Sequence, residues 1–305
     1  MEQNVSLIYA EINAHNNWRI IENFMNGKIK SNINIVFVTF CEMYFYKGGK
    51  TLKSDWVGIL HDPYNTEKYY KDKNIFKNKN FVDSLSYCKG LFCMSEELKE
   101  WVCYSLTTNF NGFIDVLYHP ISSKNLKEFN INEYKKNKCI IQIGNWLRKT
   151  YSIYKIKTNI IKEILPYTLR TQNELTYFLK RDDRTISNSE YNSVNKISKI
   201  SDQLYNNIFF NKIVFLDLYS STANNVIMEC IKSNNPIIIN RLNAIEKYLG
   251  FEYPLFYDNI DEVTELIKND ELILKTHLYL KNMNKERFYI ENFIDKININ
   301  MMKID

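Results

Sequence analysis

The sequence of 305 residues contains little glycine and little proline. Gly occurs 8 times and Pro 5 times, which excludes collagen-like and Pro-rich architectures. No run approaches the ~18 apolar residues that a membrane span needs. The N-terminus also lacks the basic start and apolar stretch of a signal peptide. We therefore expect a soluble, cytoplasmic protein.

The cysteines and histidines form no metal or disulfide pattern. None of the 6 cysteines lies in a C-x-x-C pair, and most lie in apolar runs. This favours reduced, buried thiols over a disulfide framework or a zinc site. The 4 histidines form no H-E-x-x-H motif. The sequence thus predicts no metal and no cofactor.

The charged residues are of mixed sign. Lys and Arg number 40, Asp and Glu 35, and the net charge is +5. A nucleic-acid-binding protein usually concentrates its basic residues on one face, so a nucleic-acid partner is not expected here. A weak positive field would still suit a ligand that carries phosphate.

Several nucleotide-binding and catalytic motifs are missing. The stretch from Gly48 to Thr51 looks like the end of a P-loop, but that pattern needs a Gly where Tyr44 stands. No G-x-G-x-x-G follows a strand, and no G-x-S-x-G elbow occurs. D-x-D is also absent. That absence argues against metal-dependent sugar transfer on a single α/β domain.

The chain does contain short, β-branched apolar runs that alternate with amphipathic stretches. Runs that read as strands are Val5–Tyr9, Ile33–Phe40, Trp56–Leu60, Gly90–Met94, Asp115–Tyr118, Cys139–Ile143, Ile213–Leu216, Pro236–Ile239 and Pro254–Tyr257. Helical spacing is found over Ser152–Leu165 and from Leu272 to about Ile294, whereas Thr171–Gln203 is polar and predicts loops and an insertion. Alternating strands and helices predict parallel sheets covered by helices.

The pattern stops over residues 121–138, which are polar and basic, and then starts again. We predict an N-terminal Rossmann-like domain over 1–120, a linker over 121–138, and a second Rossmann-like domain over 139–275. A C-terminal helix over 276–305 is expected to pack back toward the first domain. Ligands of such sheets bind at the carboxyl ends of the strands, and two facing sheets would leave a cleft between them.

The block Ile213–Gly250 is the most informative part of the chain. A strand ends at Asp217, a loop with Ser221 and Thr222 follows, and a helix then carries Glu229. Small hydroxyl residues at a helix N-terminus offer N–H groups and a positive dipole end to a phosphate. A carboxylate within reach can accept both hydroxyls of a ribose. The alternative is that Ser221 and Thr222 only cap the helix and that Glu229 is solvated.

From Glu229 through Asn235-Pro236-Ile237-Ile238, this block resembles the donor-binding end of GT-B glycosyltransferases, especially of family 4. The resemblance implies a GT-B fold and a nucleotide-sugar donor, and it gives Glu229 the ribose contact. Ser221 stands where the family has another Glu, which departs from the pattern. Asn240, Arg241 and Glu246 follow in a second family element, which implies contacts to the donor ribose or sugar.

Two further elements fit the same resemblance. The strand that opens the second domain ends at Gly144, and Arg148 and Lys149 follow; they would hold the donor diphosphate in place of a metal ion. The alternative is a solvated basic turn. In the first domain, His61 stands at the carboxyl end of a strand, where a His could act as general base for an acceptor hydroxyl. A structural role is its alternative.

The sequence therefore predicts a metal-independent hexosyltransferase. It would move a sugar from a UDP- or GDP-linked donor to a hydroxyl of a glycan, protein or small molecule. Two alternatives remain. One is a non-catalytic nucleotide-sugar-binding module, which the Ser221 departure favours. The other is a GT-B enzyme that glycosylates nucleic-acid bases, which would need a continuous basic groove.

Overall fold

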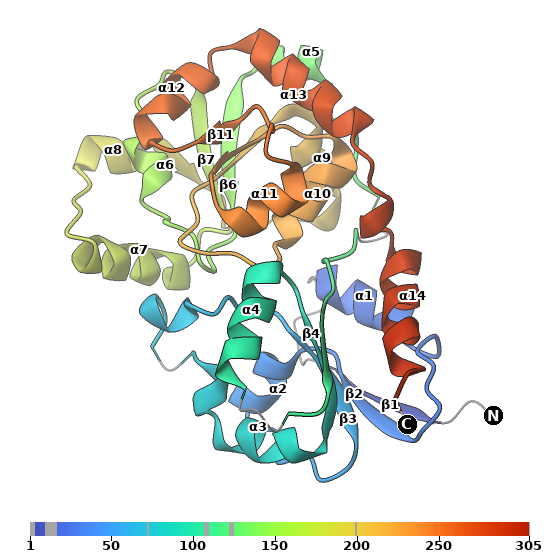
Figure 1. The fold of residues 1–305 in the computed structure, drawn as a ribbon. Helices are drawn as coiled ribbons and strands as arrows, with labels where there is room; N and C mark the ends of the chain where they lie inside the picture. Colours follow the sequence, from blue (N-terminus) through green and yellow to red (C-terminus); the bar gives the residue numbers. More distant parts are fainter. Residues whose placement is uncertain are drawn as a thin grey trace. The chain divides into compact units, whose positions relative to one another are not determined.

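The computed structural model describes residues 4–9, 17–71, 73–106, 110–121, 125–198 and 200–304. The chain divides into two compact units, each built around one parallel sheet (Figure 1). Unit 1 comprises Met1–Lys124, Ser220–Asn225 and Asn284–Asp305, and unit 2 comprises Asn125–Tyr219 and Val226–Met283. Segments from three separate parts of the sequence thus fold together in unit 1.

The sheet of unit 1 has five strands in the order β1-β2-β3-β4-β5, and all are parallel. The strands are β1 (Val5–Ile8), β2 (Ile35–Val38), β3 (Trp56–Leu60), β4 (Cys88–Cys93) and β5 (Phe113–Val116). The helices of this unit are α1 (Asn17–Met25), α2 (Cys41–Tyr46), α3 (Lys79–Ser84), α4 (Glu96–Ser105) and α14 (Ile290–Met301), with 3-10 turns at Thr66–Lys68, Ile75–Lys77, Leu85–Tyr87 and Glu286–Phe288.

Both faces of this sheet are buried. Successive side chains of a strand point to opposite faces, so Val57 and Ile59 of β3 enter one apolar cluster while Trp56 and Leu60 enter another. Helices α1 and α14 contribute side chains to the first cluster, and helices α2, α3 and α4 contribute side chains to the second. The continuous apolar run of β3 follows from this double burial.

The sheet of unit 2 has six parallel strands in the order β11-β10-β9-β6-β7-β8. The strands are β6 (Cys139–Ile143), β7 (Ile161–Leu165), β8 (Val194–Lys196), β9 (Ile213–Leu216), β10 (Ile237–Asn240) and β11 (Phe256–Tyr257). The helices are α5 (Ile131–Lys136), α6 (Ser152–Lys155), α7 (Leu169–Arg181), α8 (Asn188–Asn192), α9 (Asp202–Asn211), α10 (Asn225–Ser233), α11 (Asn243–Leu249), α12 (Val263–Leu266) and α13 (Asp270–Asn282), with a 3-10 turn at Ile260–Glu262. Strands β6 and β9 are buried along their whole length.

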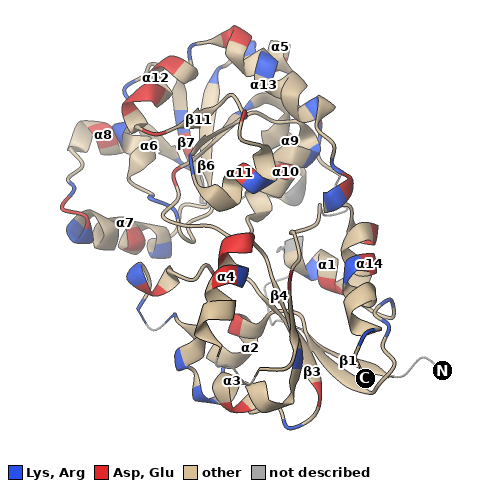
Figure 2. Ribbon diagram, viewed as in Figure 1, with Lys and Arg blue, Asp and Glu red and all other residues tan. Residues whose placement is uncertain are grey.

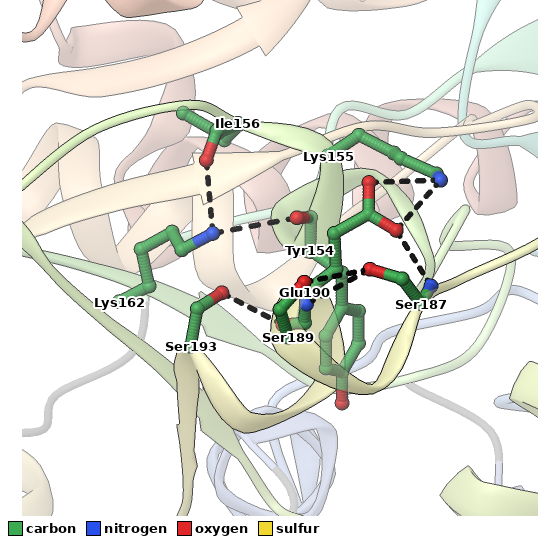
Figure 3. A network of polar contacts seen from close by, with 8 residues as sticks. All are labelled: Tyr154, Lys155, Ile156, Lys162, Ser187, Ser189, Glu190 and Ser193. Carbon is green, nitrogen blue, oxygen red and sulfur yellow. Dashed lines mark hydrogen bonds and ion pairs between the residues drawn. The ribbon is translucent and has the colours of Figure 1, made fainter.

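The stretch Ser152–Leu165, predicted as one helix, is a short helix followed by a strand. Helix α6 ends at Lys155, and β7 pairs with both β6 and β8. Lys162 of β7 is buried, and its Nζ donates to the carbonyl oxygens of Tyr154 and Ile156, as Figure 3 shows. The β-branched isoleucines favour a strand, and the buried ammonium satisfies carbonyls at the end of the helix.

The stretch Thr171–Gln203 was expected to form loops, but it contains regular structure. Helix α7 has 13 residues, is capped by the Thr168 side chain, and buries Thr171, Leu175 and Phe178. Only these three apolar or small positions face inward, so the helix has little apolar signal in sequence. Helix α8 begins with a capping box between Ser187 and Glu190, and both oxygens of Glu190 accept from Lys155 (Figure 3).

The C-terminal tail forms two helices instead of one. Helix α13 belongs to unit 2 and ends at Asn282, whereas α14 belongs to unit 1. Phe293, Ile297 and Met301 of α14 are buried in the apolar cluster that α1 also enters. Among the residues described, no helix is both long and apolar enough to cross a membrane. Lys and Arg as well as Asp and Glu are distributed over both units (Figure 2).

Candidate functional site

The carboxyl ends of β6, β9 and β10 lie next to one another in the sheet of unit 2. Gly144 follows β6 with a φ of 77°, a conformation that glycine adopts readily. A Cβ atom at this position would lie 3.3 Å from the guanidinium of Arg148. The Arg148 side chain therefore folds back over Gly144. This close approach is possible because Gly144 has no side chain.

The loops after these three strands are joined by main-chain contacts. Arg148 and Leu218 form an antiparallel bridge, and the N–H of Lys149 donates to the carbonyl oxygen of Asp217 at 2.7 Å. The Asn240 amide accepts from the N–H of Leu218 at 2.7 Å and donates to its carbonyl oxygen at 3.0 Å. The structure thus brings together four predicted site residues: Gly144, Arg148, Lys149 and Asn240.

Arg148 is held in one orientation. It is 7% exposed, its Nε donates to the carbonyl oxygen of Ile143 at 2.9 Å, and its Nη1 donates to that of Trp146 at 2.5 Å. Carbonyl oxygens satisfy the N–H groups of a guanidinium without cancelling its charge. Burial raises the pKa of Glu174 of α7, and the charges of Arg170 and then of Arg148 oppose this rise.

Lys149 is paired with an acidic residue. Its Nζ lies 2.9 Å from Oδ1 of Asp217, and the hydroxyl of Ser152 donates to Oδ2 at 2.6 Å. The side chain of Asp217 is 9% exposed and that of Lys149 29%. The Asp217 carboxylate therefore holds the Lys149 ammonium close to the carboxyl end of β9.

Glu229 is buried on α10 and has a tyrosine partner that sequence reasoning missed. It is 3% exposed, and Oε2 accepts a hydrogen bond of 2.6 Å from the hydroxyl of Tyr205 of α9. Burial and then the charge of Glu229 raise the pKa of Tyr205, and the charge of Arg148 lowers it. Tyr205 and Glu229 therefore form a buried hydrogen-bonded pair, and the charge of Arg148 acts on Tyr205. Tyr205 follows the helix cap Ser201 by four residues, but a tyrosine at this spacing carries no functional signal in sequence.

Arg241 and Glu246 form a second group at the end of β10. Nη1 of Arg241 lies 2.6 Å from Oε1 of Glu246, and its Nε lies 3.7 Å from Asp258. The guanidinium also lies over the ring of Phe256, 4.6 Å from its centroid. The side chain of Glu246, which is 9% exposed, is thus ion-paired with Arg241, which lies on the loop between β10 and α11.

Ser221 and Thr222 belong to unit 1, whereas Gly144 and Arg148 belong to unit 2. Ser221 and Thr222 are both buried, and the hydroxyl of Thr222 donates to the main-chain carbonyl oxygen of His61. The structure therefore places Thr222 together with His61. Both were predicted as site residues, but for different ligands.

His61 is enclosed by aromatic side chains at the carboxyl end of β3. Its ring stacks on Phe40 at 3.9 Å and meets Trp18 edge-on at 4.3 Å. Its Nε2 lies 3.0 Å from the carbonyl oxygen of Thr39, so Nε2 carries the proton and Nδ1 has the lone pair. Burial lowers the pKa of His61 to about 3. At neutral pH the ring is therefore a neutral hydrogen-bonding group and a weak base.

Three or more His, Cys, Asp or Glu side chains arranged to hold a metal ion do not occur in the described part of the chain. Cations near the carboxyl ends of the unit 2 strands include Arg148, Lys149 and Arg241. An anionic ligand there would be met by these side chains and by main-chain N–H groups.

Comparison with known proteins gives matches at the level of structure. No family model matches the sequence, and no curated protein matches it. An α,α-trehalose-phosphate synthase (UDP-forming) from Burkholderia xenovorans is similar, with a TM-score of 0.58, 10% identity, and coverage of 93% of this chain and 76% of that one. HepE from Anabaena in complex with UDP-glucose has a TM-score of 0.60, 10% identity, and coverage of 93% and 81%.

A TarM variant from S. aureus in complex with UDP has a TM-score of 0.60 and 12% identity, with coverage of 94% of this chain and 59% of that one. All three solved structures are GT-B glycosyltransferases. The similarity extends over nearly the whole chain and so includes the sheets of both units. The chain therefore has the GT-B fold, with two Rossmann-like sheets, as the resemblance of its sequence to that family implied.

Proposed function

We propose that this protein is a glycosyltransferase that takes its sugar from a nucleoside-diphosphate donor. The GT-B fold supports glycosyl transfer in general. The observation that carries the proposal is the grouping of Arg148, Tyr205 and Glu229 beside the joined carboxyl ends of β6 and β9. That grouping supplies a fixed cation for a diphosphate and a buried carboxylate for ribose hydroxyls.

In this proposal unit 2 binds the donor. Arg148 contacts the diphosphate, because its fork of N–H donors suits phosphate oxygens. Lys149 adds a second positive charge, which Asp217 positions at 2.9 Å. Glu229 accepts hydrogen bonds from the ribose hydroxyls, and Tyr205 holds its carboxylate. Asn240, Arg241 and Glu246 lie beyond β10 and contact the ribose or the sugar.

The transfer itself needs no metal ion in this proposal. An acceptor hydroxyl attacks the anomeric carbon of the sugar, and its proton passes to an oxygen of the departing diphosphate. The bond between that carbon and the diphosphate oxygen breaks, and its electron pair leaves with the nucleoside diphosphate. The negative charge that develops on the leaving group is stabilised by Arg148 and Lys149. The acceptor binds in unit 1 near His61, which serves as a hydrogen-bond acceptor through Nδ1.

The test combines binding with turnover. The full chain is melted with UDP, GDP, ADP and their sugars, with and without EDTA, because a ligand that binds only the folded state raises the melting temperature. Release of nucleoside diphosphate from the stabilising donor is then measured with a panel of hydroxyl acceptors. Stabilisation and release that survive EDTA support the proposal. Stabilisation without release on any acceptor supports the non-catalytic binding module instead, and no response to any nucleotide overturns the donor site.

A further inference from the structure

Glu42 holds the segment that carries His61. It lies in the first turn of α2 and is 2% exposed. Its Oε1 accepts hydrogen bonds from two successive main-chain N–H groups, that of His61 at 2.8 Å and that of Asp62 at 2.9 Å. Helix α2 follows β2, and β2 pairs with β3. A single carboxyl oxygen on the neighbouring strand's helix therefore fixes the turn that follows β3.

The other oxygen of Glu42 faces a small cavity. Among the residues described, Oε2 of Glu42 and the hydroxyl of Tyr46 are buried without a hydrogen-bond partner. Both side chains line the same cavity as Asp62, and the space there is about 10 Å³. That volume is close to the minimum that one water molecule requires. The cavity is thus suited to a water and too small for a sugar.

Several ionisable groups surround the carboxyl groups of Glu42 and Asp62. They are Cys41 and Tyr46 of α2, His61, Cys93 of β4, and Lys73. The thiols and Tyr46 have raised pKa values and the pKa of His61 is lowered, so all of these are neutral at neutral pH. Glu67 acts on Tyr46, and α4 contributes the uncharged Leu98 and Trp101. Lys73 is the one cation in this set.

Both carboxyl groups have raised pKa values. Burial, and then the charge of Asp62, raise the pKa of Glu42 well above its ordinary value. Burial raises the pKa of Asp62 to about 6, and the charge of Lys73 opposes this rise. Two carboxylates that share a site resist double ionisation, so one proton stays with the pair.

We propose that Glu42 is a positioning residue that is protonated at neutral pH and donates a hydrogen bond, through one water in the cavity, to the ionised carboxylate of Asp62. Protonation of Glu42 explains the surroundings of both of its carboxyl oxygens. The carbonyl oxygen accepts from the two main-chain N–H groups, and the hydroxyl needs an acceptor, which the water and Asp62 provide. Loss of this proton would place two negative charges beside the turn and loosen the main chain at His61.

The effect on activity rests on the proposed function, but the effect on stability does not. A folded-state pKa raised above the unfolded value gives stability that is fully present below the unfolded pKa and is lost as the pH rises through the folded pKa. The melting temperature of the full chain is therefore measured against pH for the wild type, Glu42→Gln and Asp62→Asn. Glu100→Gln, which changes an exposed carboxylate on α4, is the matched control.

We expect the wild type and Glu100→Gln to lose stability together as the pH rises from the ordinary carboxyl range through the raised pKa of Glu42. Glu42→Gln keeps an acceptor for both N–H groups and a donor toward Asp62 but cannot ionise, so its loss of stability with rising pH should be smaller. Asp62→Asn removes the repelling charge and should also reduce the loss. If both variants lose stability as steeply as the wild type, the shared proton is overturned.

The positioning role has its own readout. Glu42→Leu should lower kcat by about 10²-fold, because small displacements of reacting groups cost that much, and should leave the donor KM unchanged. Glu42→Gln should restore kcat and extend activity to higher pH. A rise in the donor KM with an unchanged kcat would overturn the role. A wild type without transfer activity but with the expected stability profile would refute the proposed function alone.

Discussion

The hydroxyl of Thr222 donates a hydrogen bond to the main-chain carbonyl oxygen of His61, although 161 positions separate the two residues. Thr222 lies in the loop between β9 and α10, and the segment Ser220–Asn225 belongs to unit 1. In the same segment Ala223 packs against the apolar cluster of α1 and α14, and the Asn225 side chain hydrogen-bonds His119. Thr222, Ala223 and Asn225 of this segment thus each contact another part of unit 1.

Replacing Thr222 by Val should destabilise unit 1. The substitution keeps the shape of the side chain but removes the donor to His61, which costs about 0.5–1.5 kcal/mol for a typical hydrogen bond. Thr222→Ser retains the hydroxyl and should cost less. Urea unfolding monitored by tryptophan fluorescence would measure the difference. Equal midpoints for Thr222→Val and the wild type would contradict the contact.

Arg148→Lys should weaken donor binding. A lysine cannot donate to Ile143 and Trp146 and still present a planar fork to a diphosphate. Hydrogen bonds to charged groups contribute about 1.5–3 kcal/mol, so we expect a loss of affinity of roughly 10- to 100-fold. Calorimetric titration with the stabilising nucleoside diphosphate would measure it. Arg184→Lys, on an exposed residue, is the control; similar affinities for the two variants would argue against the Arg148 contact.

Tyr205→Phe should destabilise unit 2 because it removes a donor to the buried carboxylate of Glu229. Loss of a partner to a buried polar group costs about 1–3 kcal/mol. The cost should be smaller when Glu229 is already Gln, so that the two changes are not additive. A double-mutant cycle by chemical unfolding would test this. Tyr177→Phe, at a tyrosine that is 52% exposed, should have little effect.

His61 should remain neutral throughout the physiological pH range. Burial lowers its pKa from 6.5 to about 3, so the folded state binds fewer protons than the unfolded state. The stability that this provides is present above the unfolded pKa and is lost as the pH falls from about 6.5 toward 3. NMR of the ring protons should place the titration midpoint of His61 well below 6.5. A midpoint near 6.5 would contradict the enclosure by Phe40 and Trp18.

Phe293→Ala should destabilise unit 1 strongly, because Phe293 of α14 is 2% exposed in the cluster around Trp18. Truncating a buried phenylalanine costs about 3–5 kcal/mol. Ile299→Ala, at a side chain of the same helix that is 59% exposed, is the control. Thermal unfolding of the two variants would compare them. Equal melting temperatures would show that α14 does not pack on unit 1.

Much of the strand pattern could be predicted from local sequence. Trp56–Leu60, Cys139–Ile143 and Ile213–Leu216 are strands with the predicted bounds, because fully buried parallel strands are continuous apolar runs. The stretch before Leu165 was predicted wrongly as helix. Isoleucines at this spacing fit either a helix or a strand. The segment Ile161–Leu165 is a strand because it pairs with β6 on one side and β8 on the other.

The candidate site shows the same division. Gly144, Arg148 and Lys149 were predicted as donor-binding residues from the resemblance to GT-B glycosyltransferases, in which such residues follow the strand that opens the second domain. The partners that orient the predicted residues were not found: Tyr205 for Glu229, Asp217 for Lys149 and Glu42 for His61 come from other elements. No local pattern records these pairs, since each depends on which chain segments the sheet order brings together.

Local sequence was sufficient for the α/β class and for two Rossmann-like sheets, because side-chain periodicity and the order of strands and helices are properties of neighbouring residues. The GT-B fold was implied by the resemblance of the block around Glu229 to that family. The protonation and the partners of the site residues depended on folding. Burial and opposing charges come from segments distant in sequence, and these determine that His61 is neutral, that Glu42 keeps a proton and that Thr222 contacts the end of β3.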